Sequence, residues 1–172
     1  FSFYLDNLVM NAADALMKVG MQLSVVKLAK AQPMQTKLDQ LDRVMSDLDG
    51  VIIPPPIADK PEVRRYLQRL GKPYVLLSGK IEEDSAIRVC IDNFAAAQEV
   101  TDHLIALGHS RIAYISGGEN YDSFERERGF RRSLEKAGID LEPEFIQQGD
   151  FTYESGLTAA ETLLSRDHRP TA

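Results

Sequence analysis

The fold is decided by residues 87–118, which have the sequence IRVCIDNFAAAQEVTDHLIALGHSRIAYISGG. The first five residues are mostly β-branched and apolar, and they predict a strand. Asp92 or Asn93 then caps an alanine-rich helix that reaches Leu107 and stops at a glycine. The run Ile112-Ala113-Tyr114-Ile115 predicts a second strand. A strand, a helix and another strand in succession predict two parallel strands joined by a right-handed crossover.

The same alternation of strand and helix continues outward in both directions. Helical spacing of apolar residues predicts further helices, and short β-branched runs predict further strands. The helices are expected over 5–19, 34–48, 61–70, 123–137 and 153–164, and the strands over 21–28, 51–53, 74–77 and 145–147. The segment 78–88 is acidic and lacks a periodic face, so we interpret it as the connection between two lobes. The predicted fold class is α/β.

Composition excludes several classes of protein. The chain has 172 residues, 20 Lys and Arg against 26 Asp and Glu, and a net charge of −6. This length suits one domain or two small lobes, and the acidic balance is wrong for a module whose main contact is a phosphate backbone. Apolar runs are too short to span a bilayer. The single cysteine, Cys90, permits no intrachain disulfide, and its apolar strand predicts an inert core thiol.

Signatures of catalysis and of metal or phosphate binding are missing from the sequence. Gly117-Gly118 follows a strand, but neither dinucleotide nor P-loop glycine spacing is present, so a plain turn is expected. The three histidines are not grouped with carboxylates at metal spacing. Asp92 is expected to cap its helix rather than act as a general base, and a structural role is expected for His109. No cofactor or metal is predicted.

Arg126 falls in the first turns of a helix that begins beside a predicted sheet end, where ligands of parallel sheets bind. Its planar guanidinium can grip a carboxylate, or the vicinal hydroxyls of a sugar, with two parallel donors. The surrounding string 125–128 alternates in charge, which also fits a solvated helix face. The spacing alone favours neither interpretation.

Residues 101–113, TDHLIALGHSRIA, resemble the T-x-x-L-I-x-L-G-H-x-R-I-A run of the lactose/galactose repressor (LacI/GalR) family. Arg126-x-x-Gly129-Phe130 is similar to the R-x-x-G-F signature of that family. Other landmarks follow in the same order along the chain: 49–53, 72–75, 91–92, 149–151, 155–156 and 169–172. The resemblance covers essentially the whole chain.

The resemblance implies a two-lobed, periplasmic-binding-protein-like α/β fold with a ligand cleft. The lobes would be 1–91 and 92–172, with the first strand missing and the second lobe partial. It implies the effector-binding domain of a cytoplasmic transcription regulator, which is not an enzyme and forms a homodimer. A small sugar-like effector would control DNA binding by a helix-turn-helix headpiece that precedes this domain.

The resemblance also implies a set of effector-binding residues. Arg126 matches the ligand-gripping arginine of the family, and this match favours a functional role for it. The remaining residues would stack on the ligand or meet it at strand ends and in the loop before Arg126. The complete expected set is Tyr4, Phe3, Ser78, Asn120, Asp122, Arg126 and Phe151.

Two other functions are compatible with the same architecture. The first alternative is a periplasmic sugar-binding protein of a transport system, which would need an export leader. A signal peptide upstream would favour the transport protein, whereas a helix-turn-helix would favour the regulator. The second alternative is an α/β enzyme, which the missing nucleophile, metal and phosphate signatures disfavour.

Overall fold

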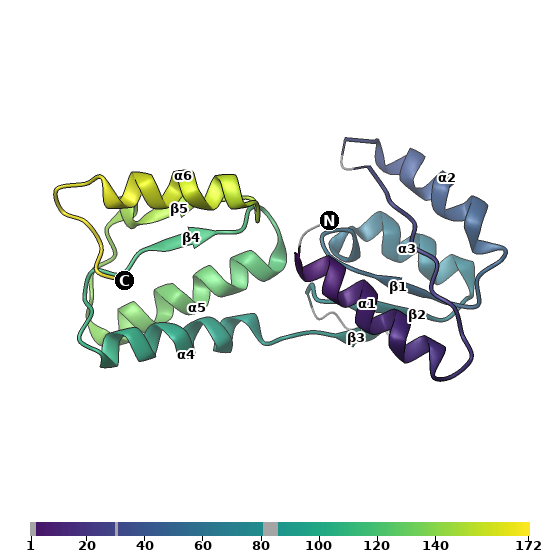
Figure 1. The fold of residues 1–172 in the computed structure, drawn as a ribbon, viewed down its shortest axis with the longest axis horizontal. Helices are drawn as coiled ribbons and strands as arrows, with labels where there is room; N and C mark the ends of the chain where they lie inside the picture. The colour runs from purple at the N-terminus through teal and green to yellow at the C-terminus, as the bar shows by residue number, and fades with distance from the viewer. Residues whose placement is uncertain (1–2, 30, 81–85) are drawn as a thin grey trace. The chain divides into compact units, whose positions relative to one another are not determined.

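The computed structural model describes residues 3–29, 31–80 and 86–172. The chain divides into two compact units, 1–49 and 50–172. Parallel strands flanked by helices are present, as the sequence predicts, so the predicted α/β class is confirmed (Figure 1). The lobe boundary expected between 91 and 92 stays a prediction. Among the described residues, no helix is long and apolar enough to cross a membrane.

The first unit contains two helices, α1 (Phe3–Met17) and α2 (Met34–Met45). Both lie where helical spacing predicts them. After α1 the chain turns at Gly20, whose φ of 75° lies in the left-handed region that favours glycine. Leu41 and Met45 are the buried residues of α2.

The strand expected over 21–28 is wrong. These residues are not assigned to any strand, and each of them is exposed or half-buried. A strand needs a hydrogen-bonded neighbour, and no described strand pairs with this segment. Its β-branched composition shows a preference for a sheet, but composition cannot supply the neighbour.

The second unit begins with a parallel sheet in the order β1-β2-β3. β1 (Val51–Ile53) pairs with β2 (Tyr74–Leu77), and β2 pairs with β3 (Ile87–Val89). A helix, α3 (Pro61–Leu70), connects β1 to β2 and buries Val63 and Leu67. Proline at the first position of α3 fits, because the first helical N–H has no partner within the helix.

β3 ends two residues earlier than the sequence predicts, and this changes the position of the cysteine. Cys90 follows the strand and is exposed, so the expected core thiol is wrong. β3 lies at the edge of its sheet with β2 as its neighbour, and Ile87, Val89 and Ile91 are exposed as well. The apolar run therefore predicts the strand correctly here, but it does not predict that the side chains are buried.

A second parallel pair, β4 (Tyr114–Ser116) and β5 (Ile146–Gln148), follows in the same unit. The helices α4 (Asn93–Ala106) and α5 (Tyr121–Ala137) lie side by side on one face, and α6 (Tyr153–Leu164) covers the other (Figure 1). Short 3-10 helices, Ile57–Asp59 and Pro143–Phe145, complete the unit. Beside β4, Ala113 N–H donates to the Ala172 carbonyl, and Ala172 N–H donates to the Arg111 carbonyl.

The core of this region joins α5 to the sheet and to α4. Ile112, Phe130 and Leu134 are buried together, and the Phe130 ring stacks on Tyr114 with centroids 5.2 Å apart. Gly129 faces α4 so closely that a Cβ there would overlap the backbone oxygen of Phe94. The R-x-x-G-F motif therefore has a structural meaning: its glycine permits close helix packing, and its phenylalanine anchors α5 to β4.

Candidate functional site

A cavity of about 430 Å³ opens at the carboxyl ends of β4 and β5. Polar groups and aromatic rings share its lining, with backbone contributed by several glycines. Ligands of parallel α/β sheets bind at this edge, because the strand ends and helix N-termini converge there. The lining consists of Tyr114, Ile115, Ser116, Gly117, Ser123, Arg126, Gly149, Phe151, Thr152, Tyr153, Ser155 and Gly156.

Arg126 reaches this cavity from the second turn of α5, and its guanidinium is hydrogen-bonded to the buried side-chain amide of Asn93. Its Nε–H donates to Oδ1 of Asn93 over 2.7 Å. Asn93 is 6 % exposed and begins α4. Arg126, Gly129 and Phe130 are spaced i, i+3 and i+4, so they share one helix face. Phe130 and Gly129 fix that face against the sheet and α4, and Arg126 is thereby directed to the strand ends.

Asp122 lies one helical turn before Arg126 and is 8 % exposed. Its Oδ1 accepts hydrogen bonds from Asn93 Nδ2 at 3.1 Å and from the Gly79 N–H at 3.4 Å. Gly79 belongs to the turn after β2, so Asp122 connects α5 to the other parallel sheet. The loop prediction for Asp122 is corrected, because this residue belongs to the first turn of α5.

Asp59 lies beside the same turn. A Cβ on Gly79 would overlap its Oδ1, which is buried and accepts no hydrogen bond. Burial raises the pKa of Asp59 above its ordinary value of 3.8, and the charge of Asp122 adds to this effect. The carboxyl groups of Asp59 and Asp122 therefore both lie beside Gly79, and a side chain at this position would overlap the carboxyl group of Asp59.

The Phe151 ring covers the end of β4. A Cβ on Gly117 would overlap this ring, so glycine is what admits the aromatic group. Among the described residues, the non-glycine positions with positive φ are Phe151 at 66° and Ser78 at 60°. Such backbone costs about 1–3 kcal/mol and persists where the surroundings impose it, often at functional sites. Both residues belong to the expected effector-binding set: Ser78 directly follows β2, and Phe151 lies three residues after the end of β5.

The loop between β4 and α5 is held by its own polar side chains. Asn120 caps α5 by accepting from Ser123 N–H at 3.0 Å, and Ser123 Oγ accepts from Gly117 N–H at 2.8 Å. Asn120 therefore shapes the loop and is absent from the cavity lining. The Tyr114 hydroxyl donates to the Ser123 carbonyl, and burial raises the pKa of this phenol above its ordinary value of 10.0.

The remaining residues of the expected set lie elsewhere. Ser78 is buried, and its N–H donates to the Val89 carbonyl at 2.8 Å, which ties the end of β2 to β3. Tyr4 is exposed on α1, in the first unit. The side chain of Phe3 lies outside the described residues. The structure thus brings Arg126 and Phe151 to one cavity. Asp122 does not line this cavity and is linked to Arg126 through the side chain of Asn93.

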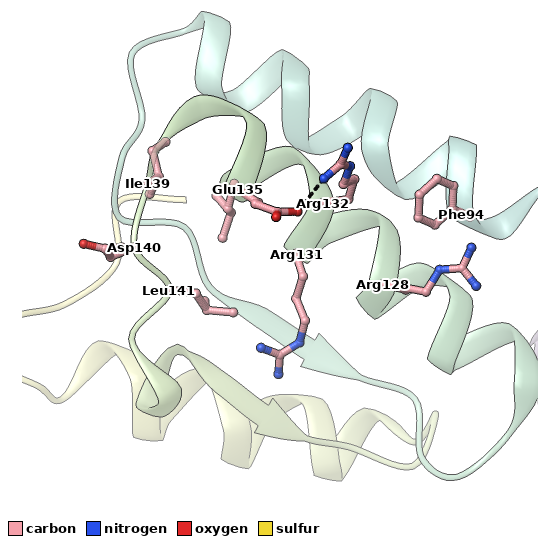
Figure 2. A pocket seen from close by; sticks show the side chains of 9 residues that line it. Phe94, Arg128, Arg131, Arg132, Glu135, Ile139, Asp140 and Leu141 are labelled. Atoms are coloured by element: carbon pink, nitrogen blue, oxygen red, sulfur yellow. Dashed lines mark hydrogen bonds and ion pairs between the residues drawn. The ribbon is translucent and has the colours of Figure 1, made fainter.

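A larger cavity, of about 630 Å³, lies along the outer part of α5 (Figure 2). Its arginines have carboxylate partners on the same helix: Arg128 with Glu125, Arg131 with Glu127 and Arg132 with Glu135. Figure 2 shows Arg131 and Arg132 pointing away from each other. These side chains do not converge on one point, so the smaller cavity at the strand ends is the better candidate site.

The expected capping role of Asp92 is confirmed, and the structural role expected for His109 stays a prediction. Asp92 is the N-cap of α4, where its carboxylate accepts from Ala95 N–H at 2.9 Å. His109 Nδ1 lies 2.9 Å from the Thr171 hydroxyl. Within 3–29, 31–80 and 86–172, no group of three or more His, Cys, Asp or Glu side chains is placed to hold a metal ion.

The family model for "Periplasmic binding proteins and sugar binding domain of LacI family" matches residues 2–172. The chain belongs to this family. The LacI-family resemblance seen in the sequence is confirmed, and so is the periplasmic-binding-protein-like fold with its parallel sheets.

Similar LacI-family proteins are transcriptional regulators. The chain is 36 % identical over 123 residues to the HTH-type transcriptional regulator CelR of Thermobifida fusca, covering 69 % of this chain and 36 % of CelR. It is 38 % identical over 101 residues to catabolite control protein A of Priestia megaterium, covering 57 % of this chain and 30 % of that protein. The chain therefore spans about a third of the length of these relatives.

Solved LacI-family structures share the fold. A putative transcriptional regulator LacI from Bacillus cereus subsp. cytotoxis matches with a TM-score of 0.77 and 27 % identity, over 95 % of this chain and 58 % of that one. A CelR–cellobiose complex matches with a TM-score of 0.73 and 29 % identity, over 91 % and 48 %. These relatives are transcriptional regulators.

Asn93 is not among the site residues predicted from the sequence. The sequence indicates it only as a possible helix cap, a role that belongs to Asp92. The available signal was the pair of polar residues between a strand and a helix, since one cap is sufficient and the second side chain is free for another contact.

Proposed function

We propose that this chain is the effector-sensing core of a LacI-type transcription regulator, and that it binds a small carbohydrate at the carboxyl ends of β4 and β5. The family match and the regulators among its relatives support this function and favour it over a periplasmic transport protein. The observation that carries the proposal is the convergence of Arg126 and Phe151 on one cavity at the strand ends.

The chemistry of this cavity suits a sugar ring. The Phe151 ring is 57 % exposed, so one of its faces is available to the apolar face of a pyranose. The guanidinium of Arg126 presents parallel donors to neighbouring hydroxyl groups. Serine and threonine hydroxyls in the lining add donors and acceptors for the remaining hydroxyls. A solved relative is a complex with cellobiose, which makes a disaccharide a sensible first probe.

Effector binding would act on DNA through parts of the regulator outside this chain. A ligand that binds one arrangement of the lobes better than another shifts the population toward it. In a cytoplasmic homodimer, such a shift changes the spacing of two helix-turn-helix headpieces on operator DNA. Coupling free energies of this kind typically amount to about 1–3 kcal/mol.

Isothermal titration calorimetry with a panel of mono- and disaccharides, cellobiose included, tests the proposal. The wild-type chain is expected to bind one of them, and Arg126→Ala is expected to weaken that binding at least tenfold, because charge-assisted hydrogen bonds contribute about 1.5–3 kcal/mol. Arg132→Ala is the matched control on the outer face of α5, and it should bind like the wild type. Equal affinities of the Arg126→Ala variant and the wild type, or no binding across the panel, would contradict the proposal.

A further inference from the structure

The amide of Asn93 uses both of its ends within the candidate site. Its Oδ1 accepts from Arg126 Nε at 2.7 Å, and its Nδ2 donates to Asp122 Oδ1 at 3.1 Å. Nδ2 also lies 3.4 Å from the Ile91 carbonyl. An amide is suited to this position because it combines an acceptor for the cation with a donor for the carboxylate.

Helix formation does not require this side chain. Asp92 already caps α4, so Asn93 at the first helical position has no capping role. Asparagine has only modest helix propensity, and its polar amide is buried at 6 % exposure. A buried polar group is retained where it has hydrogen-bond partners, and here the two shortest contacts, at 2.7 and 3.1 Å, are both with residues of α5. The contacts with Arg126 and Asp122 therefore explain the residue better than the helix does.

The same contacts reach the other parallel sheet. Asp122 accepts from the Gly79 N–H, directly after Ser78 at the end of β2. A chain of hydrogen bonds thus runs from the cavity-lining guanidinium through Asn93 and Asp122 to the turn after β2. A change at either end alters the partners available to the next group in the chain.

We propose that Asn93 is a positioning residue: it orients Arg126 toward the cavity and links that arginine, through Asp122, to the turn after β2. The link to carbohydrate binding rests on the proposed function, whereas the positioning of Arg126 does not. Asn93 acts without touching the ligand, since it is absent from the cavity lining. Occupation of the cavity is thereby communicated to the Gly79 amide through three side chains, those of Arg126, Asn93 and Asp122.

Nuclear magnetic resonance of the ligand-free chain tests the positioning directly. The Arg126 Nε–H resonance, assigned by its loss in Arg126→Lys, is expected to be protected from exchange in the wild type. Asn93→Ala should remove this protection. Asn93→Asp should preserve it, because a carboxylate oxygen still accepts from Nε, and aspartate at the first helical position favours the helix.

The Gly79 amide resonance reports the second half of the link. Asn93→Asp should shift it strongly, since the new carboxylate repels Asp122 while Arg126 remains held. Glu99→Ala, on the exposed face of α4, is the control and should change neither resonance. An Arg126 resonance that is identical in wild type and Asn93→Ala overturns the positioning role, and an unmoved Gly79 resonance in Asn93→Asp overturns the link.

Binding of the carbohydrate found by calorimetry completes the test. Asn93→Ala should weaken it about tenfold, the effect of one lost hydrogen bond to a charged group, and Asn93→Asp should restore most of that loss. Unchanged affinity in Asn93→Ala would overturn the role in binding. If no carbohydrate binds the wild type, the proposed function fails, and the two resonances still decide whether Asn93 positions Arg126.

Discussion

Replacing Gly129 by alanine has two opposing effects on the free energy of unfolding, one from helix propensity and one from packing against α4. Glycine in the interior of a helix is less favourable than alanine by about 0.8–1.0 kcal/mol, so propensity alone predicts that Gly129→Ala stabilises α5. The structure predicts the opposite sign. The new Cβ would overlap the Phe94 carbonyl oxygen and would lie 3.1 Å from the Ala97 Cβ.

The packing effect is expected to dominate. Extra methylene groups in a well-packed core typically cost about 1–3 kcal/mol. The upper end applies here, because the obstacle is backbone at the start of α4 and not the end of a flexible side chain. A cost of about 3 kcal/mol less a propensity gain of about 1 kcal/mol leaves a net destabilisation of about 2 kcal/mol.

Urea unfolding followed by circular dichroism measures this difference, and Gly156→Ala provides the matched control. Gly156 lies within α6, and nothing lies within 4 Å of the position of its Cβ. Propensity therefore acts alone there and predicts stabilisation by up to about 1 kcal/mol. If both variants gain stability equally, the close approach of α4 and α5 at Gly129 is refuted.

Three further variants test the core, a helix cap and a buried carboxyl group. Phe130→Ala removes a ring that is 3 % exposed and should cost about 3–5 kcal/mol in urea unfolding; a loss below about 1 kcal/mol would contradict its role as an anchor. Asp92→Ala should cost about 1 kcal/mol and Asp92→Asn much less, since asparagine still caps α4; equal losses would argue against capping. Because burial raises the pKa of Asp59 in the folded chain, its contribution to stability is full below pH 3.8 and is lost as the pH rises through the raised value. Asp59→Asn should therefore be more stable than wild type at pH 7 by urea unfolding, with the difference shrinking toward acidic pH, and a pH-independent difference would contradict this account.

Local rules predict the helices and most strands of this chain well. Gly138 has a φ of 65° at the end of α5, and Pro61 begins α3, as their backbone preferences require. Such signals depend on neighbours along the chain, so a single sequence contains them. The strand expected over 21–28 fails for the opposite reason, because pairing depends on a partner that the segment cannot specify.

Burial and side-chain partners are harder to predict from the sequence. Cys90 lies in an apolar run yet is exposed, since β3 ends at Val89 and the cysteine follows the strand. Arg126 is identified as a site residue by resemblance to a family, whereas spacing alone leaves two interpretations open. Asn93 is not predicted as a site residue, because its role depends on residues 29 and 33 positions away in the sequence. The three-dimensional structure is what brings those residues together.

The most direct test of the proposed effector site is to locate the bound carbohydrate by amide chemical-shift mapping. The full chain would be titrated with the sugar that calorimetry identifies. The largest shifts are expected at Gly117, Gly149 and Phe151, together with the side-chain Nε–H of Arg126. Shifts confined to the outer face of α5, around Arg131 and Arg132, would contradict a binding site at the carboxyl ends of β4 and β5.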